Sequence, residues 1–141
     1  VTSIGNDAFE GCSLASIEIP KSVTSIGPNA FTDCSSLATV TFETGSQLST
    51  IGPGVFLGCN LLERIELPCS VTSIGATAFS HCANLISLTI NTQAGYVWQK
   101  GSDFSFTSDL SIVDLSNPTQ NATWFKETSG YYNYLWRQVA A

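Results

Sequence analysis

Val23-Thr24-Ser25-Ile26-Gly27-Pro28-Asn29-Ala30-Phe31-Thr32-Asp33-Cys34 is the stretch that decides the fold, because its pattern recurs along the chain. Copies with the same order of aliphatic residue, Gly, small residue, Phe and Cys occupy residues 1–12, 48–59 and 71–82. Each copy is followed by a second apolar block that reads L-x-x-I-x-I or a close variant. The leading leucines of these blocks are Leu14, Leu37, Leu62 and Leu85.

The repeat keeps an almost constant length. Between leading leucines the step is 23, 25 and 23 residues. Turns of a solenoid keep such a step because each turn must stack on the previous one. One more step of 25 reaches Leu110, and Phe104 lies six residues before it, as Phe31 does before its own leucine. We therefore expect about five turns in residues 1–116, four clear and one degenerate.

The apolar block predicts a short strand. In Ser16-Ile17-Glu18-Ile19 the isoleucines point to one side and the polar residues to the other. Stacked turns would join these strands into a parallel sheet on the concave face. The Gly-rich return stretch predicts an irregular or 3₁₀ convex side, with a tight bend that needs the backbone freedom of glycine. The phenylalanines are expected to stack as an internal ladder of Phe9, Phe31, Phe56 and Phe79.

Composition limits the function classes. Apolar residues make up 43% of the 141, enough for a globular core, and only 11% are charged. The formal net charge of −6 argues against nucleic acid or an anionic membrane as the main partner. No apolar run approaches the roughly 18 residues of a membrane span. Residue 1 is not Met and no signal peptide is visible, so we expect a processed or trimmed chain.

The sequence contains no recognisable catalytic or metal-binding motif. His81 precedes Cys82, but Asp33 and Gly58 occupy the equivalent places of other turns, and neighbouring side chains of an extended segment point apart. There is no C-x-x-C, no Gly-rich phosphate loop and no G-x-S-x-G. Acidic residues two turns apart would lie roughly 10 Å from each other, beyond the spacing of glycosidase pairs. We expect no enzyme, no metal and no cofactor.

Four cysteines recur at one position of the turn: Cys12, Cys34, Cys59 and Cys82. Stacking brings them within disulfide reach of one another, but the repetition favours buried thiols that behave as small apolar side chains. Cys69 takes the place of Lys21 after the strand-ending proline, so we expect it to be exposed and able to form an intermolecular disulfide.

The outward residues of the predicted strands are the candidate partner-binding site, since the fold does not constrain them. They form two columns about 20 Å long, Thr- and Ser-rich and mildly acidic. The columns are Ser16, Thr39, Arg64, Ser87 and Ile112, and Glu18, Thr41, Glu66, Thr89 and Asp114.

The two ends of the solenoid raise a separate question. Residues 117–141 leave the repeat and contain six aromatic residues, which predicts a cap over the last turn or, alternatively, an aromatic interface. Val1 starts directly in the repeat, so the first turn lacks a cap, and we expect self-association there or further turns before it.

The motif I-G-x-x-A/V-F-x-x-C resembles the BspA-like, or Treponema pallidum type, class of leucine-rich repeats. The resemblance covers residues 1–90 with four copies and extends loosely to 116. The segments 114–118, 121–123 and 131–134 look like the C-terminal part of treponemal members. The resemblance implies a leucine-rich-repeat solenoid and a cell-surface or secreted protein of a host-associated microbe that attaches to host matrix proteins or mediates cell contact.

Two functions follow for the solenoid. The first is an extracytoplasmic protein–protein interaction module that adheres to host or bacterial proteins through the concave sheet. The alternative is a periplasmic or structural scaffold that self-associates through its ends. In both functions the partner is a protein. We expect no nucleic-acid partner and no insertion of the chain into a membrane.

Overall fold

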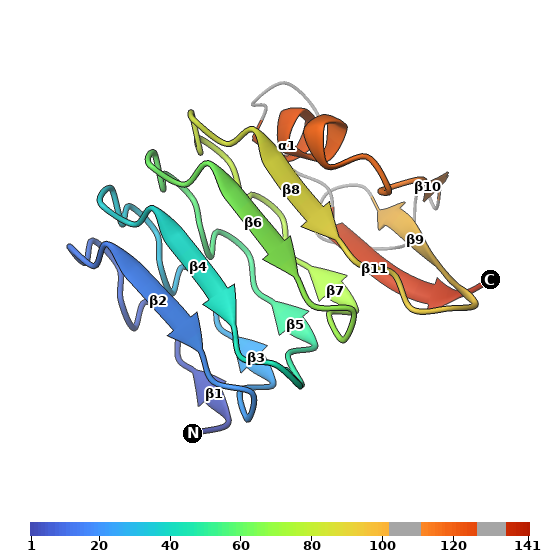
Figure 1. Ribbon diagram of the computed structural model, residues 1–141, viewed down its shortest axis with the longest axis horizontal. Coiled ribbons are helices and arrows are strands. Elements are labelled where there is room, and N and C mark those ends of the chain that lie inside the picture. Colours follow the sequence, from blue (N-terminus) through green and yellow to red (C-terminus); the bar gives the residue numbers. More distant parts are fainter. Residues whose placement is uncertain (102–110, 127–134) are drawn as a thin grey trace.

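The computed structural model describes residues 1–101, 111–126 and 135–141, and shows turns of chain stacked side by side (Figure 1). The predicted strands lie along one long face. Pairing is parallel, with Ser16 opposite Thr39 and Arg64 opposite Ser87, as the repeat predicts. These four-residue strands are β2 (Ser16–Ile19), β4 (Thr39–Phe42), β6 (Arg64–Leu67) and β8 (Ser87–Ile90).

The opposite face is also a sheet, which the sequence did not indicate. Two-residue strands formed by the Ser-Ile or Thr-Ile pair of each turn join in parallel there. The rest of the return stretch consists of tight turns, such as the one in which Ala30 N donates to Gly27 O at 3.3 Å. The predicted irregular structure is therefore found only in the part of each return stretch that follows the two-residue strand. The strands are β1 (Ser3–Ile4), β3 (Ser25–Ile26), β5 (Thr50–Ile51) and β7 (Ser73–Ile74).

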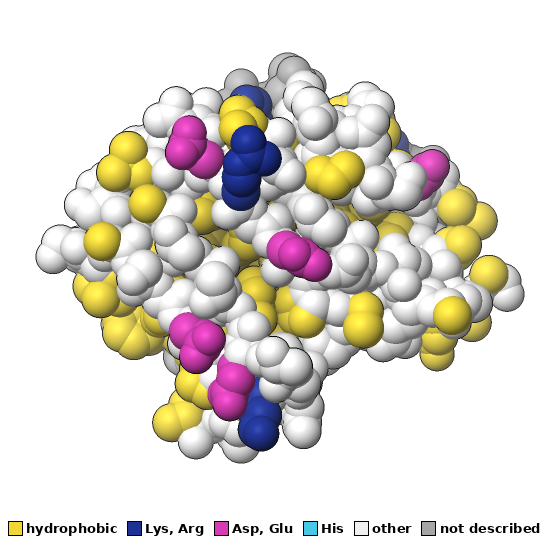
Figure 2. All heavy atoms as spheres, in the orientation of Figure 1, with side chains coloured by type: hydrophobic (Ala, Val, Ile, Leu, Met, Phe, Trp, Pro, Cys, Tyr) yellow, Lys and Arg dark blue, Asp and Glu magenta, His cyan; other side chains and the backbone are white. Residues whose placement is uncertain are grey.

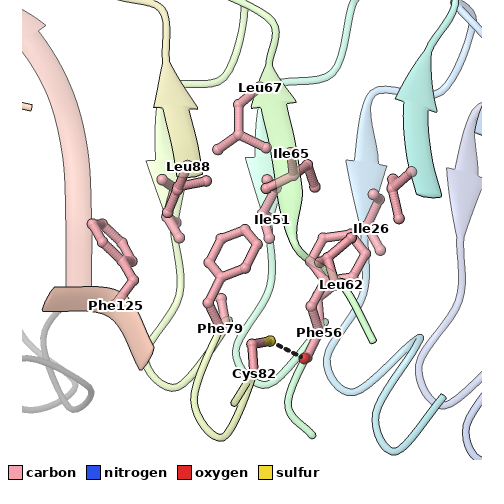
Figure 3. Packing of buried hydrophobic residues seen from close by; sticks show 14 of the residues in the cluster. Ile26, Ile51, Phe56, Leu62, Ile65, Leu67, Phe79, Cys82, Leu88 and Phe125 are labelled. Atoms are coloured by element: carbon pink, nitrogen blue, oxygen red, sulfur yellow. Dashed lines mark hydrogen bonds between the residues drawn. The ribbon is translucent and has the colours of Figure 1, made fainter. Parts of the chain in front are cut away.

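The predicted phenylalanine ladder is confirmed. The ring centroids of Phe31 and Phe56 are 5.7 Å apart and those of Phe56 and Phe79 are 5.4 Å apart, with nearly parallel planes. Phe9 stacks on Phe31 at 5.2 Å. Figure 3 shows the rings of Phe56 and Phe79 pointing into the interior beside Leu62, Ile65 and Leu88. Burying each such ring contributes about 1.5–3 kcal/mol, so the ladder accounts for much of the core.

Three glycines of the Ile-Gly pairs, Gly27, Gly52 and Gly75, are needed for close approach between turns. Their φ angles lie outside the left-handed region, so the predicted reason, backbone freedom, is wrong. A Cβ on Gly52 would lie 2.9 Å from both Ile26 O and Pro28 N of the preceding turn. Apart from Gly45 and Gly95, the left-handed residues of the described chain lie elsewhere in the turn, in two columns: Asp7, Asn29, Gly54 and Thr77, and Gly11, Asp33, Gly58 and His81.

The C-terminal part does not add a fifth parallel strand. β10 (Ser111–Val113) pairs antiparallel with β9 (Tyr96–Gly101) and belongs to the sheet of the opposite face. The predicted place beside β8 is taken by α1 (Pro118–Lys126), which packs against that strand. Phe104 and Leu110, which suggested the extra turn, lie outside the described residues.

The C-terminal segment covers the last turn, and the aromatic cap is confirmed for the aromatic residues that the structure describes. β11 (Leu135–Ala140) pairs antiparallel with β7 and β9. Phe125 meets Phe79 edge-on at 6.1 Å, and Trp136 lies 4.7 Å beyond Phe125. Asn121 Nδ2 donates to Leu88 O at 2.9 Å, so α1 satisfies a carbonyl of β8. Tyr131, Tyr132 and Tyr134 lie outside the described residues.

Candidate protein-binding face

The outward residues of β2, β4, β6 and β8 form the candidate partner-binding surface, here named the partner face. Alternation along each strand turns the aliphatic residues inward and leaves these polar side chains exposed or half-buried. Their order across neighbouring strands is set by the ladders, for example Glu18 opposite Thr41 and Glu66 opposite Thr89. The partner face comprises Ser16, Glu18, Thr39, Thr41, Arg64, Glu66, Ser87 and Thr89.

Two residues predicted for this face lie elsewhere. Ile112 is opposite Gln99 in the sheet of the other face and is 67% exposed. Asp114 follows β10, and hydrogen bonds from the hydroxyl and amide of Ser116 hold the pKa of its carboxyl below the usual value. The predicted placement of Ile112 and Asp114 is wrong because β10 pairs with β9 in the sheet of the opposite face and does not extend the row of β2, β4, β6 and β8.

The partner face is divided by a groove between β4 and β6. The paired strands are β2 with β4 and β6 with β8, and no backbone hydrogen bond joins β4 to β6 among these fully described strands. The groove has a volume of about 650 Å³. Figure 2, which looks onto this face, shows a hollow there with apolar atoms at its bottom.

A two-residue insertion accompanies the groove. Five residues separate Phe42 from Leu48, whereas three separate Ile19 from Val23. The longer loop, residues 43–47, lines one end of the groove with Glu43, Thr44, Gly45 and Ser46. The 25-residue step between Leu37 and Leu62 is the sequence signal for this site.

Charges are few on the groove and lie at opposite ends of it. Arg64 stands at the start of β6, and Glu66 stands near its end. Glu43 adds a second carboxylate in the loop after β4, where Oε2 accepts a hydrogen bond from Lys21 N at 2.9 Å. Glu66 Oε1 accepts one from Asn91 Nδ2 at 3.2 Å. The groove therefore has a positive end and a negative end, with an apolar floor that includes Val40.

The geometry of the described residues offers little for metal or acid–base chemistry. The described part of the chain contains no group of three or more His, Cys, Asp or Glu side chains placed to hold a metal ion. His81 is exposed with φ 59°, close to the 58° of Asp33 at the equivalent position, which identifies it as a turn residue. No helix in the described ranges has the length and apolar character to cross a membrane.

The repeated cysteines are free thiols that bind the preceding turn. Cys82 Sγ donates to Phe56 O at 3.1 Å (Figure 3), and Cys59 makes the same bond to Phe31 O at 3.3 Å. Desolvation by burial raises the pKa of the Cys82 thiol to about 12. The interpretation as buried thiols is confirmed for Cys34, Cys59 and Cys82, while Cys12 is half-buried. Cys69 is exposed, as predicted.

Comparison with known proteins identifies the repeat. The BspA type leucine rich repeat region matches residues 1–128 in six copies. A leucine-rich repeat protein from Bacteroides capillosus is 33% identical over 64% of this chain and 64% of its own, with a TM-score of 0.57. The T. pallidum leucine-rich repeat protein is 34% identical over 62% of this chain and 51% of its own, with a TM-score of 0.48.

Each match spans less than two thirds of the relative's own length. No curated protein matches the chain. The family match covers the four turns and also α1. The chain belongs to the BspA-type leucine-rich-repeat family.

Proposed function

We propose that the chain is an extracytoplasmic protein–protein interaction module that adheres to a host or bacterial protein through the partner face. The observation that carries the proposal is the groove of about 650 Å³ within a row of exposed polar side chains. None of these side chains is needed for the core, so the fold does not restrict which residues occupy these positions and they can be suited to a partner. Leucine-rich repeats are in general a protein-interaction fold, which supports the same conclusion.

The chemistry of the face favours a polar protein surface as partner. Threonine and serine hydroxyls both donate and accept hydrogen bonds, so they can pair with backbone and side-chain polar groups on the surface of a protein. The face carries the cation of Arg64 and the carboxylates of Glu18 and Glu66, so no single sign of charge dominates. An anionic polymer or lipid surface would instead select a cluster of lysines and arginines.

A matched pair of variants tests the face. Thr41→Arg places a bulky cation on β4, and Thr50→Arg places the same side chain on β5 of the opposite sheet. Both threonines are exposed, so both variants should fold. Binding to immobilised host matrix proteins is measured by surface plasmon resonance. Thr41→Arg should weaken binding at least about tenfold and Thr50→Arg should leave it unchanged. Equal effects of the two substitutions would refute binding through the partner face, and no binding by the unaltered chain would refute adhesion to host matrix proteins.

The extracytoplasmic location has its own test. Protease is added to intact source cells, with a known periplasmic protein as control. Cleavage of this chain while the control survives supports adhesion outside the cell. If both proteins are cut only after the envelope is broken, the partner is to be sought inside the bacterium. The treponemal source inferred from residues 114–134 stays a prediction, checked by sequencing the source genome.

A second candidate is a scaffold that self-associates through the first turn. Phe9 is 37% exposed, whereas Phe31, Phe56 and Phe79 are fully buried in the same ladder. The outer edges of β1 and β2 are likewise unpaired among the described strands. Sedimentation velocity over a concentration series tests this candidate. It predicts oligomers that Phe9→Ser dissolves and Thr50→Arg does not, and a monomer at every concentration would rule it out.

A further inference from the structure

The groove exposes an unpaired edge of β4. Glu43 N donates to Ile19 O at 2.9 Å, and Thr39 N donates to Ala15 O at 3.3 Å, so these residues turn their backbone groups toward the first turn. Alternate residues of a parallel strand turn their N–H and C=O to opposite sides. The backbone groups of Val40 and Phe42 therefore point into the groove.

The edge of β6 facing the groove is unpaired for the same reason. Ser87 N donates to Glu63 O at 3.2 Å, so Glu63 and, two residues on, Ile65 turn toward β8. Arg64 and Glu66 then turn their backbone groups toward β4. Two four-residue strands thus face each other with open hydrogen-bonding edges, and an unpaired strand edge is a template for another chain.

The groove must widen to accept a strand. A strand between β4 and β6 needs twice the strand spacing, about 9.6 Å. Some Cα atoms of the two strands lie within 8 Å of each other, so an opening of at least about 2 Å is required. On the opposite face, β3, β5 and β7 form an unbroken parallel sheet through Ile26, Ile51 and Ile74. This sheet can act as a hinge, and the two extra residues of the 43–47 loop provide the slack.

We propose that the groove binds an extended peptide segment of the partner protein, inserted as a strand between β4 and β6 and parallel to them. The inference rests on the proposed function and names the kind of contact. Main-chain hydrogen bonds to both open edges would hold the segment, as in other strand-addition complexes. Its alternate side chains would be apolar, to contact Val40 and Ile65, and polar where they face solvent.

For a segment inserted parallel to β4 and β6, the charges of the groove determine which end residues are complementary. Its first residue would lie beside Arg64, and its last residue would lie beside Glu43 and Glu66. A segment that begins with an acidic residue and ends with a basic one is therefore complementary at both ends. The opposite order would place like charges together, which disfavours binding.

A designed peptide provides the probe. The acetylated and amidated hexapeptide Glu-Thr-Val-Thr-Val-Lys, carrying a fluorophore, is titrated with the full chain, and anisotropy reports binding. The peptide with Lys and Glu exchanged should bind about fivefold more weakly, because both end contacts become repulsive. A third peptide, N-methylated at both valines, has the same side chains without those amide donors. Its affinity for the chain should be lower by at least about tenfold.

A deletion variant tests the groove itself. Removing Thr44 and Gly45 leaves three residues between Phe42 and Leu48, the length found after β2 and β6. We expect β4 and β6 to pair, the groove to close and the peptide to lose at least about tenfold in affinity, while far-UV circular dichroism is retained. Equal binding by the deletion variant, or by the N-methylated peptide, would overturn the proposal.

Hydrogen exchange on the unaltered chain keeps the test independent of the variant's folding. Without peptide, the amides of Val40 and Glu66 should exchange at least about tenfold faster than those of Thr41 and Ile65, and peptide should slow them. Slow exchange at all four amides without peptide would contradict the open edges. If Thr41→Arg abolishes binding to the partner protein but the peptide does not bind, the partner face stands and strand insertion fails.

Discussion

Gly52→Ala tests whether close stacking of turns, and not backbone freedom, explains the Ile-Gly column. The new Cβ would lie 2.9 Å from Ile26 O and Pro28 N and 3.0 Å from the carbonyl carbon of Gly27. All three are backbone atoms, so no side chain can rotate away. Gly5 occupies the same position of the first turn, and a Cβ there would meet nothing within 4 Å.

The magnitude follows from the displacement that the Cβ requires. Ordinary contact is about 3.5 Å, so the two turns must separate by about 0.5 Å. Overpacking of this kind costs about 1–3 kcal/mol. The separation also stretches the 2.9 Å hydrogen bond from Gly52 N to Ile26 O, which contributes about 1 kcal/mol. Gly52→Ala should therefore lower the free energy of unfolding by about 2–4 kcal/mol. Gly5→Ala should raise it by about 0.4–1 kcal/mol, because alanine restricts the unfolded chain.

Urea unfolding measures both variants, with tryptophan fluorescence as the signal, because Trp98 and Trp136 are buried in the folded chain. With a slope of about 2 kcal/mol per molar urea, Gly52→Ala should shift the midpoint down by about 1–2 M. If Gly52→Ala and Gly5→Ala have the same midpoint, the close-approach argument is wrong and the column has another cause.

Three further predictions concern single positions. Thr77→Gly should raise the free energy of unfolding by about 0.5–1 kcal/mol in the same urea assay, since a β-branched residue at φ 61° is strained; a lower midpoint would contradict this. At pH 8 a thiol reagent should modify Cys69 quickly and leave Cys82 unmodified until unfolding, because the raised pKa keeps Cys82 protonated; mass spectrometry of labelled peptides decides. Asn121→Ala should cost about 2–3 kcal/mol, as it leaves Leu88 O without its donor, and a change below about 0.5 kcal/mol would show that water replaces the amide.

The periodic residues made much of the fold predictable from the sequence. The alternation in Ser16–Ile19 and its copies predicted the strands of the partner face, and the fixed position of Phe31 and its equivalents predicted the ladder. Both inferences needed only the length of the repeat, because identical residues of stacked turns must lie above one another. The burial of Cys34, Cys59 and Cys82 and the exposure of Cys69 follow from the same register.

The sequence was less informative where two turns meet through their backbones. The repeat places Gly52 in a column of glycines, but the role of this residue depends on a distance to Ile26 O that no sequence pattern contains. The Ser-Ile strands of the opposite face were missed, because two residues are too few to show alternation. Ile112 was misplaced because α1 occupies the edge of β8, an outcome of packing between segments far apart in the chain.

The repeat by itself determined that this chain is a solenoid, which residues face inward, and which row of polar side chains is available to a partner. Only the tertiary structure decided where the solenoid ends and where its sheet opens. Within one turn, the apolar or polar character of each side chain determines whether it faces the core or the solvent. Pairing between turns depends instead on backbone separation: β4 and β6, on either side of the longer 43–47 loop, do not pair, and α1 packs against β8.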